Sequence, residues 1–199
     1  MKRFLCVFFA VLLSAALLSC AQDTKSNSGE GKSLAQLIRN KEYVDILMDN
    51  GGLIRLELYP DLAPITVENF LKLVDSGFYD GLRFQRVEPG FVIQGGDPSE
   101  NGDNTGRTDP IKGEFSANGI NNPLKHERGV VSLARATGYD TGSCQFFIVL
   151  KASSAEHLNG NYAAFGSVRE GMDVVDQIVN DYVENGTIHT MVSVKRVSE

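Results

Sequence analysis

The sequence predicts a mainly β fold, in which short antiparallel strands close into a barrel with a helix at each end. Many short apolar runs, several of them alternating with polar residues, are separated by turns rich in Gly, Pro and Asn. Two longer segments, far apart in the chain, carry the apolar spacing of an amphipathic helix, at residues 64–76 and 170–180. A closed sheet covered at its ends by two helices buries both kinds of apolar surface.

The first 19 residues predict a secretory signal peptide outside this fold. Lys2 and Arg3 precede an apolar run from Phe4 to Leu18, which is shorter than the roughly 20 residues that a membrane-spanning helix needs. The run ends in Leu17-Leu18-Ser19-Cys20, which resembles a bacterial lipobox, where the cysteine is lipidated and becomes the new N-terminus. The alternatives are an ordinary signal with a chance cysteine and a membrane-embedded anchor helix.

A lipidated Cys20 followed by a flexible tether is expected over residues 20–42. Ala21 to Ser33 is polar, rich in Ser, Gly and Asn, and without apolar periodicity, and a short helical turn follows within residues 34–42. Several acyl chains give stable membrane anchoring. We therefore expect a lipid-anchored, extracytoplasmic protein of the bacterial cell envelope. Because no Asp directly follows Cys20, the outer membrane is favoured in a Gram-negative cell, at its periplasmic face or at the surface.

The composition excludes several classes of function. A formal net charge of −6 and the lack of a basic run argue against nucleic-acid binding. The three cysteines are too scattered for a disulfide framework or a metal site, and His126, His157 and His189 lack the paired spacing of metal ligands. The segment from Asp97 to Thr108 faintly resembles a calcium loop, but a threonine stands where the twelfth-position acid belongs. We therefore expect no metal and no cofactor.

Taken in order, residues 43–199 predict one domain that begins with a hairpin and a helix. Apolar residues alternate with polar ones in 44–48 and 54–58, on either side of the turn signal Asp49-Asn50-Gly51-Gly52. The helix at 64–76 begins at a proline, carries one apolar stripe and ends before a glycine. The stripe is expected to form core.

The later part of the domain predicts further strands and the second helix. The strand at 144–150 is apolar on both faces, so we expect it to be buried or to line a pocket. Its consecutive Phe146 and Phe147 must point to opposite faces. The remaining predicted elements are strands on either side of Pro89-Gly90, strands at 129–134 and 190–197, and the helix at 170–180 with Met172, Val175, Ile178 and Val179 facing inward.

The stretch from Phe84 to Asp97 carries the most distinctive chemistry. It places one fixed cation, Arg86, between aromatic and aliphatic side chains and follows it with an amide, Gln94. It contains no obvious nucleophile, and the chain has no G-x-S-x-G stretch of the kind that serine hydrolases use. A site of this kind can bind and polarise a neutral substrate but is poorly equipped to break a covalent bond.

Four blocks of the sequence closely resemble the cyclophilin-type peptidyl-prolyl cis-trans isomerases, and the leader resembles that of a bacterial lipoprotein. The blocks occur in the order of the family and with roughly its spacing, and the resemblance covers residues 43–197. It implies a closed eight-stranded antiparallel β-barrel capped by two α-helices. The four blocks are Phe84–Asp97, Gly129–Ala134, Ser143–Ile148 and Asn161–Gly166.

The resemblance also implies a role for individual residues. Arg86 matches the catalytic arginine, and Gln94 matches the glutamine that holds the substrate backbone and Arg86. Ala134, Arg135 and Ala136 match the strand edge along which the peptide lies, where the backbone of Arg135 binds. The other implied substrate-binding positions are the proline-pocket walls Phe91, Val92, Phe147 and Leu158, the second binding amide Gln145, and His157 and Tyr162 near the rim.

The sequence departs from the family pattern at a few of these positions. Val92 replaces a methionine, so that wall is shorter and stiffer. His157 stands where many eukaryotic members have the Trp that contacts cyclosporin, and Tyr162 stands where they often have His. One residue more than in short eukaryotic members separates Ala136 from Gln145. We therefore expect isomerase activity with weak cyclosporin binding.

These residue types suit rotation about an X-Pro bond. The barrier, about 18–20 kcal/mol, is the loss of amide resonance on twisting, so the catalyst must bind the twisted state better than either planar one. A guanidinium can donate a hydrogen bond to the prolyl nitrogen, whose lone pair becomes available only as resonance is lost. Apolar walls would hold the proline ring and strengthen the field of Arg86 by excluding water.

The sequence as a whole therefore predicts an isomerase of X-Pro peptide bonds that assists the folding of exported proteins. Its expected partners are proline-containing polypeptides and, through Cys20, the membrane. Two other interpretations remain open at this point: a non-catalytic peptide-binding or chaperone module on the same barrel, and a structural or adhesive surface lipoprotein. The presence of Arg86 favours the enzyme.

Overall fold

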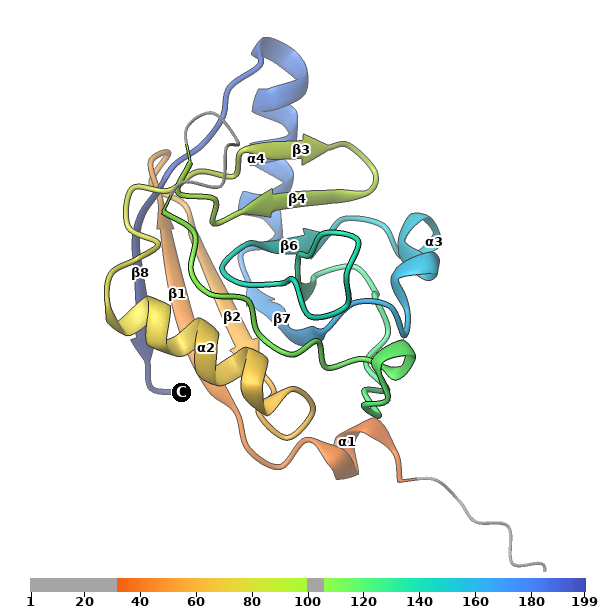
Figure 1. The fold of residues 1–199 in the computed structure, drawn as a ribbon. Helices are drawn as coiled ribbons and strands as arrows, with labels where there is room; N and C mark the ends of the chain where they lie inside the picture. The colour runs from red at the N-terminus through yellow and green to blue at the C-terminus, as the bar shows by residue number, and fades with distance from the viewer. Residues whose placement is uncertain (1–31, 100–105) are drawn as a thin grey trace, which may run out of the picture. The chain divides into compact units, whose positions relative to one another are not determined.

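The computed structural model describes residues 32–99 and 106–199, and residues 32–199 form one compact unit (Figure 1). The predicted signal peptide, the predicted lipidation site Cys20 and the predicted tether up to residue 31 lie outside the described residues. None of the helices within the described ranges is long and apolar enough to cross a membrane.

After the short helix α1 (Leu34–Leu37), the backbone N–H groups of Arg39 and Asn40 donate hydrogen bonds of 2.8 and 2.7 Å to Asp61, which ties this segment to the domain.

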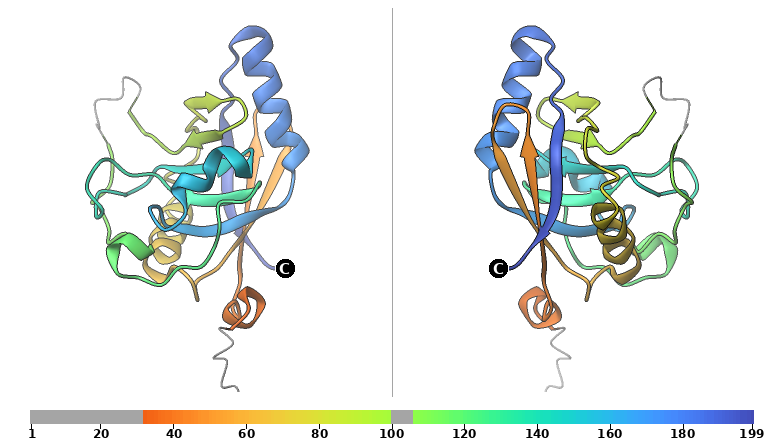
Figure 2. Two further views of the ribbon diagram at one scale, coloured as in Figure 1. Left: turned by 90° about the vertical axis from the view of Figure 1, so that its right-hand side faces the viewer. Right: turned by 90° about the vertical axis from the view of Figure 1, so that its left-hand side faces the viewer.

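Eight antiparallel strands form a single curled sheet, and the prediction of a mainly β, eight-stranded antiparallel fold is confirmed (Figures 1 and 2). The strands lie side by side in the order β3-β4-β6-β5-β7-β2-β1-β8. Their bounds are β1 Glu42–Met48, β2 Leu53–Leu58, β3 Arg86–Glu88, β4 Val92–Gly95, β5 Val130–Leu133, β6 Phe146–Val149, β7 Ala164–Glu170 and β8 Met191–Val197.

The first hairpin forms where alternation and turn chemistry predict it. β1 pairs with β2 in a register that places Leu47 opposite Leu53, and Gly51 occupies the turn with a φ of 81°. A positive φ is favourable for glycine and costly for most other residues. Val44, Ile46 and Met48 point into the core with at most 1% of their surface exposed.

Two long helices pack against the sheet near its opposite ends (Figure 2). α2 (Pro64–Asp75) confirms the first predicted helix, with Pro64 in its first turn and its apolar stripe buried. α4 (Met172–Asn185) differs from the prediction of 170–180, because it starts later and continues to Gly186, whose φ is 75°. Its last turn exposes Val183, so apolar spacing gave no sign of this extension. The short elements are α3 (Ala152–Ala155) and the 3-10 helices η1 (Ser116–Asn118) and η2 (Glu156–Leu158).

β7 is a strand that the apolar pattern did not predict. It pairs with β2 on one side and β5 on the other, in the middle of the sheet. Gly166 and Ser167 interrupt its apolar pattern. A Cβ at position 166 would lie 2.6 Å from the carbonyl oxygen of Glu57, so the close approach of β2 requires glycine there.

The predicted closure of the barrel is wrong, because the sheet is open between β3 and β8. These are the two edge strands, and the segments before them are joined by one isolated bridge, Arg83 to Thr190. The backbone N–H of Phe84 donates to His189 over 3.1 Å beside this bridge. A continuous ladder does not form because the chain before β3 turns repeatedly, with positive φ angles at Gly77 and Gly81.

The buried side chains form two clusters on opposite faces of the sheet. The main core lies on the face toward α2 and α4 and includes Phe70, Phe84 and Phe146. The second cluster lies on the other face of β4, β6 and β5, beneath α3 and η2. It consists of the buried residues Tyr59, Leu62, Val92, Leu124, Val130, Phe147, Val149, Ala155, Leu158 and Ala164.

Candidate active site

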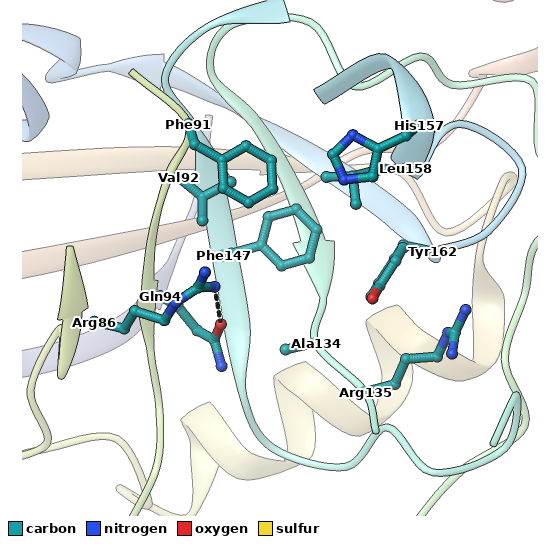
Figure 3. Close-up of a pocket in the computed structure, with 10 residues that line it drawn as sticks. All are labelled: Arg86, Phe91, Val92, Gln94, Ala134, Arg135, Phe147, His157, Leu158 and Tyr162. Atoms are coloured by element: carbon teal, nitrogen blue, oxygen red, sulfur yellow. Dashed lines mark hydrogen bonds between the residues drawn. The ribbon is translucent and has the colours of Figure 1, made fainter. Parts of the chain in front are cut away.

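An open cavity of about 250 Å³ lies over the second cluster (Figure 3). Its walls come from β3, β4, β6, the segment after β5, and η2 with the segment that follows it. Ten of the twelve predicted catalytic and substrate-binding residues line this one cavity. They are Arg86, Phe91, Val92, Gln94, Ala134, Arg135, Phe147, His157, Leu158 and Tyr162.

The floor of the cavity is apolar because of strand alternation. The register between β4 and β6 sets Gln94 opposite Phe147, so both side chains emerge on the same face of the sheet. Phe146 points the other way, into the main core, as the sequence predicts for two consecutive phenylalanines. Phe147 is only 5% exposed, and the ring of Tyr162 meets it edge-on with a centroid distance of 5.8 Å. Phe91 stacks on His157 at 5.6 Å and completes the rim.

Arg86 lies at the mouth of this apolar pocket. Its Nη1 donates a 3.3 Å hydrogen bond to Gln94 Oε1, and its Nε lies 3.4 Å from a carboxylate oxygen of Glu88. The guanidinium carbon lies 6.0 Å from the centre of the Phe91 ring. The side chain remains 46% exposed, so a bound molecule can reach it. Figure 3 shows Arg86 and Gln94 on one side of the Phe147 ring and Tyr162 on the other.

The two remaining predicted binding residues, Ala136 and Gln145, line an adjoining cavity of about 260 Å³. Gln94, Ala134 and Arg135 contribute to both cavities, so the two form one continuous surface. Along this surface the Ala134 N–H donates to Gln145 O over 2.9 Å, and the Ala136 N–H donates to Thr141. The backbone N–H and C=O of Arg135 have no hydrogen-bond partner among residues 32–99 and 106–199. The edge is therefore open to an extended peptide at the position that the resemblance implies.

The side chain of Arg135 has a structural function that the sequence did not predict. Its guanidinium carbon lies 4.5 Å from the ring centre of Tyr162 and 5.2 Å from that of Phe115. Its Nε and Nη2 donate hydrogen bonds of 3.0 and 2.9 Å to the carbonyl oxygen of Asn161. These contacts fix the pocket wall at Tyr162 relative to the peptide-binding edge.

His126 is a second residue that sequence reasoning did not connect to the site. Its ring stacks beneath Phe147 at a centroid distance of 6.0 Å. Its Nε2 lies 3.0 Å from the Ser132 hydroxyl and its Nδ1 lies 3.1 Å from Asn159 Oδ1. Burial lowers the pKa of His126 to about 4, so the ring is neutral at pH 7. A lone histidine gives no sequence signal of this position.

The site shows no arrangement suited to a metal. Within the part of the chain that the structure describes, no group of three or more His, Cys, Asp and Glu side chains is placed to hold an ion. Cys144 is a buried free thiol.

Comparison with known proteins identifies relatives of one kind. Residues 43–199 match the family model described as cyclophilin type peptidyl-prolyl cis-trans isomerase/CLD. Peptidyl-prolyl cis-trans isomerase B of Bacillus subtilis is 47% identical over 134 residues, which cover 67% of this chain and 88% of that protein. Peptidyl-prolyl cis-trans isomerase of Helicobacter pylori is 44% identical over 131 residues, covering 65% of this chain and 76% of that protein.

Solved structures show the same similarity in three dimensions. A cyclophilin type peptidyl-prolyl cis-trans isomerase of Cryptosporidium parvum superposes with a TM-score of 0.69 at 27% sequence identity, covering 80% of this chain and 99% of that one. A second structure of that protein, in the presence of the dipeptide ala-pro, gives a TM-score of 0.68 at 28% identity, covering 79% of this chain and 99% of that one.

Proposed function

Because the chain belongs to the cyclophilin-type peptidyl-prolyl cis-trans isomerase family, we propose that it catalyses rotation about X-Pro bonds of exported proteins, with Arg86 as the catalytic residue. The isomerase activity follows from the family. The identity of the catalytic group and the class of client are our proposals. The observation that carries the assignment of Arg86 is the position of its exposed guanidinium at the mouth of an apolar slot floored by Phe147. The class of client is inferred from the predicted leader sequence.

The slot fits a proline ring. Phe91, Val92, Phe147 and Leu158 supply apolar walls, and no ionisable group lies among these four. The relative from Cryptosporidium parvum was solved in the presence of the dipeptide ala-pro, and we infer that this chain binds proline-containing peptides in the same way. The residues before and after the proline would extend along the Ala134–Ala136 edge.

The proposed reaction needs no covalent intermediate. As the X-Pro bond twists, the prolyl nitrogen becomes pyramidal and gains a lone pair, and Arg86 donates a hydrogen bond to it. This hydrogen bond forms only in the twisted state, so it lowers the barrier without tightening ground-state binding. Gln94 holds the guanidinium from behind through its 3.3 Å hydrogen bond.

The test compares the purified wild-type protein with Arg86→Ala and Arg86→Lys in a proline-peptide isomerisation assay. We expect Arg86→Ala to lower kcat/KM by at least about tenfold, since a hydrogen bond to a charged group contributes about 1.5–3 kcal/mol. Arg86→Lys keeps the charge without the planar fork and should recover only part of the activity. A wild-type protein that binds proline peptides without accelerating isomerisation would instead be a peptide-binding module.

We also propose that the protein is lipid-anchored through Cys20 in the bacterial envelope and meets its clients there. The lipobox-like sequence and the polar segment after it support this. Expression of the full chain in bacteria with a labelled fatty acid should give a labelled protein in the membrane fraction. The Cys20→Ala variant should lose both the label and the membrane association. Labelled Cys20→Ala protein would contradict the proposal.

Weak cyclosporin binding is a further part of the proposal. His157 is exposed at the rim, where it stacks on Phe91, and it offers less apolar area than an indole would. The His157→Trp variant should therefore bind cyclosporin more tightly than the wild type in a fluorescence titration. Nanomolar binding by the wild type would contradict this.

A further inference from the structure

A row of hydrogen bonds leads from Arg86 into the protein and ends at a carboxylate. Gln94 accepts from Arg86 through its Oε1, and its Nε2 donates a 2.7 Å hydrogen bond to Gln145 Oε1. Gln145 in turn donates from its Nε2 to Asp97 Oδ2 over 2.8 Å. We call these four residues, Arg86, Gln94, Gln145 and Asp97, the amide relay.

The direction of the relay follows from the chemistry of its two ends. A carboxylate can only accept hydrogen bonds, and a guanidinium can only donate them. Gln145 must therefore turn its amino group toward Asp97, which leaves its oxygen to face Gln94. Gln94 must then turn its amino group toward Gln145, which leaves its oxygen to face Arg86. An isolated glutamine has no such preference, because its two amide ends are nearly equal in size.

Asp97 is well placed to fix this direction. Its side chain is only 7% exposed, and it also accepts hydrogen bonds from Arg107 and from the hydroxyl of Ser99, the latter at 2.8 Å. Burial alone would raise the pKa of Asp97, but the hydrogen bonds from Arg107 and Ser99 outweigh it and hold the pKa below its ordinary value. Asp97 is thus ionised, and acceptor-only, throughout the neutral pH range.

The orientation of the amide relay leaves one polar atom of Gln85 without a hydrogen bond. Its Nε2 donates a second hydrogen bond, of 3.1 Å, to Gln145 Oε1. Its own Oε1 is buried without a hydrogen-bond partner among the described residues. Burying an acceptor without a partner is unfavourable, because the atom loses its hydrogen bonds to water. Turning the Gln85 amide around would set two carbonyl oxygens against each other, so the orientation of Gln145 also dictates that of Gln85.

We propose that Asp97 is a positioning residue for isomerisation, which holds a carbonyl oxygen against Arg86 by orienting Gln145 and Gln94 in turn. This proposal rests on the proposed catalytic role of Arg86. Asp97 itself lines neither of the two cavities described above. Its effect reaches the substrate through three side chains, and it should change the rate of isomerisation rather than the fold.

The first test is Asp97→Asn, which keeps the size of the side chain but lets it both donate and accept. Gln145 and Gln94 can then turn around, so that an amino group faces Arg86. We expect kcat/KM for a proline peptide to fall about tenfold, since the hydrogen bond to the guanidinium is charge-assisted. Asp61→Asn is the matched control, because Asp61 is a hydrogen-bonded carboxylate outside the relay. It should leave kcat/KM unchanged.

The second test moves the carboxylate one position along the relay. In Gln145→Glu, two carboxylates face each other and activity should fall. In the double variant Asp97→Asn with Gln145→Glu, position 145 carries the acceptor-only group. The carboxylate at position 145 accepts a hydrogen bond from the amide introduced at position 97, and it again directs the Gln94 oxygen toward Arg86. We expect the double variant to be more active than either single variant. If Asp97 served only to anchor Arg107, the double variant would be no better than Asp97→Asn.

Three outcomes would overturn the proposal. One is a folded Asp97→Asn protein with kcat/KM within twofold of wild type. Another is a double variant less active than both single variants. The third, measured in the wild type and independent of any variant's folding, is a pair of side-chain amide NMR signals for Gln94 and Gln145 that exchange with water as fast as exposed amides. If Arg86→Ala loses activity while Asp97→Asn keeps it, the relay fails and the proposed function stands. Full activity of Arg86→Ala would overturn both.

Discussion

The two faces of β6 differ in what their side chains must do. On one face Phe146 is 1% exposed and touches three aromatic rings, with centroids 5.4 Å from Phe70, 5.7 Å from Tyr79 and 5.9 Å from Phe84. On the other face Phe147 touches a buried histidine and a tyrosine and opens onto a cavity. The main core needs only shape and apolarity. The second cluster must hold polar groups in fixed orientations beside an apolar floor.

This difference explains where function depends on detail. In the main core, replacing a side chain by an apolar one of similar volume should cost little stability, because van der Waals contacts are not directional. On the face of the second cluster, a hydrogen-bonding group that turns around changes the chemistry offered to a ligand, as Gln94 illustrates. We therefore expect changes on the first face to alter stability and changes on the second face to alter activity. The predictions below test that division.

The largest expected effect on stability is that of Phe146→Ala. Removing a fully buried phenylalanine side chain leaves a cavity and destabilises a protein by about 3–5 kcal/mol. Phe147→Ala should be less destabilising, because the site borders an open cavity, but should lower kcat/KM at least tenfold or so through the lost contact with the proline ring. Denaturant unfolding and isomerase assays of both variants measure the two effects.

Equal losses of stability in Phe146→Ala and Phe147→Ala would contradict the division between the two faces. Phe146→Leu serves as the conservative version in case Phe146→Ala does not fold. It should lose part of the stability and, at a temperature where it is folded, retain wild-type kcat/KM. A folded Phe146→Leu protein with strongly reduced activity would show that the two faces are not separable.

The sequence predicted the first face better than the second. Period-two alternation and the spacing of the α2 stripe identify buried residues such as Ile54 and Phe70 directly, because burial follows from apolarity. β7 was missed because close packing against β2 requires Gly166, which carries no apolar signal. Closure of the barrel was predicted wrongly, because the chain turns at Gly77 and Gly81. As a result, Arg83 rather than β3 forms a bridge with the segment before β8.

The resemblance to a family predicted ten residues that do line one pocket, but not what holds them. Asp97 was named only as the end of the Phe84–Asp97 block and as part of a rejected calcium loop, without a role of its own. Its contact with Gln145 joins residues 48 positions apart. Arg135 was assigned a backbone role, whereas its side chain packs on aromatic rings brought together by the fold. Such contacts depend on tertiary placement and leave no local pattern in a single sequence. The roles of the individual site residues remain predictions.

The second expected effect concerns His126 and sharpens the comparison, since it is a buried titratable group that stacks on Phe147 of the second cluster. Its pKa is about 4 in the folded protein and about 6.5 in the unfolded chain, so acid protonates the unfolded state first. The free energy of unfolding should therefore fall as the pH drops from 6.5 toward 4, by up to about 3 kcal/mol from this residue. Denaturant unfolding between pH 7 and 4 measures the fall.

The matched variant is His126→Gln, which lacks the titrating ring. Between pH 6.5 and 4 its stability should depend on pH less steeply than that of the wild type. Identical slopes for the two proteins would mean that His126 takes up its proton without unfolding the second cluster.

A smaller effect of opposite sign is expected from His189, which lies in the segment just before β8. Its ring lies between two carboxylates, 2.6 Å from Asp49 and 2.8 Å from Asp181. Burial alone would lower the pKa of His189, but these two partners outweigh it and raise the pKa above its ordinary value. The stabilisation is complete below about pH 6.5 and is lost as the pH rises through the folded-state pKa.

Unfolding measurements at pH 6, 7.5 and 9 test this prediction. The wild type should lose stability across this range, and His189→Gln should lose less of it. Isomerase activity corrected for the folded fraction should not differ between the two proteins, because His189 does not line the pocket. An activity difference would show that the bridge between Arg83 and Thr190 transmits strain to β3.

The smallest expected effect is that of Glu88→Gln, which separates the two polar partners of Arg86. Glu88 lies 3.4 Å from the guanidinium but is 52% exposed, so water and salt screen the ion pair, and such pairs contribute about 0–1 kcal/mol. Gln94 is a neutral partner, yet its orientation is fixed from within by Gln145. We expect Glu88→Gln to change kcat/KM by less than about twofold and the free energy of unfolding by less than about 0.5 kcal/mol.

An assay repeated at low and high salt distinguishes Glu88 from Gln94 further. High salt should abolish the small effect of Glu88→Gln by screening the ion pair, while it leaves the loss of activity in Asp97→Asn unchanged. A Glu88→Gln variant as impaired as Asp97→Asn would mean that net charge at the mouth of the pocket, rather than the orientation of Gln94, determines how Arg86 acts.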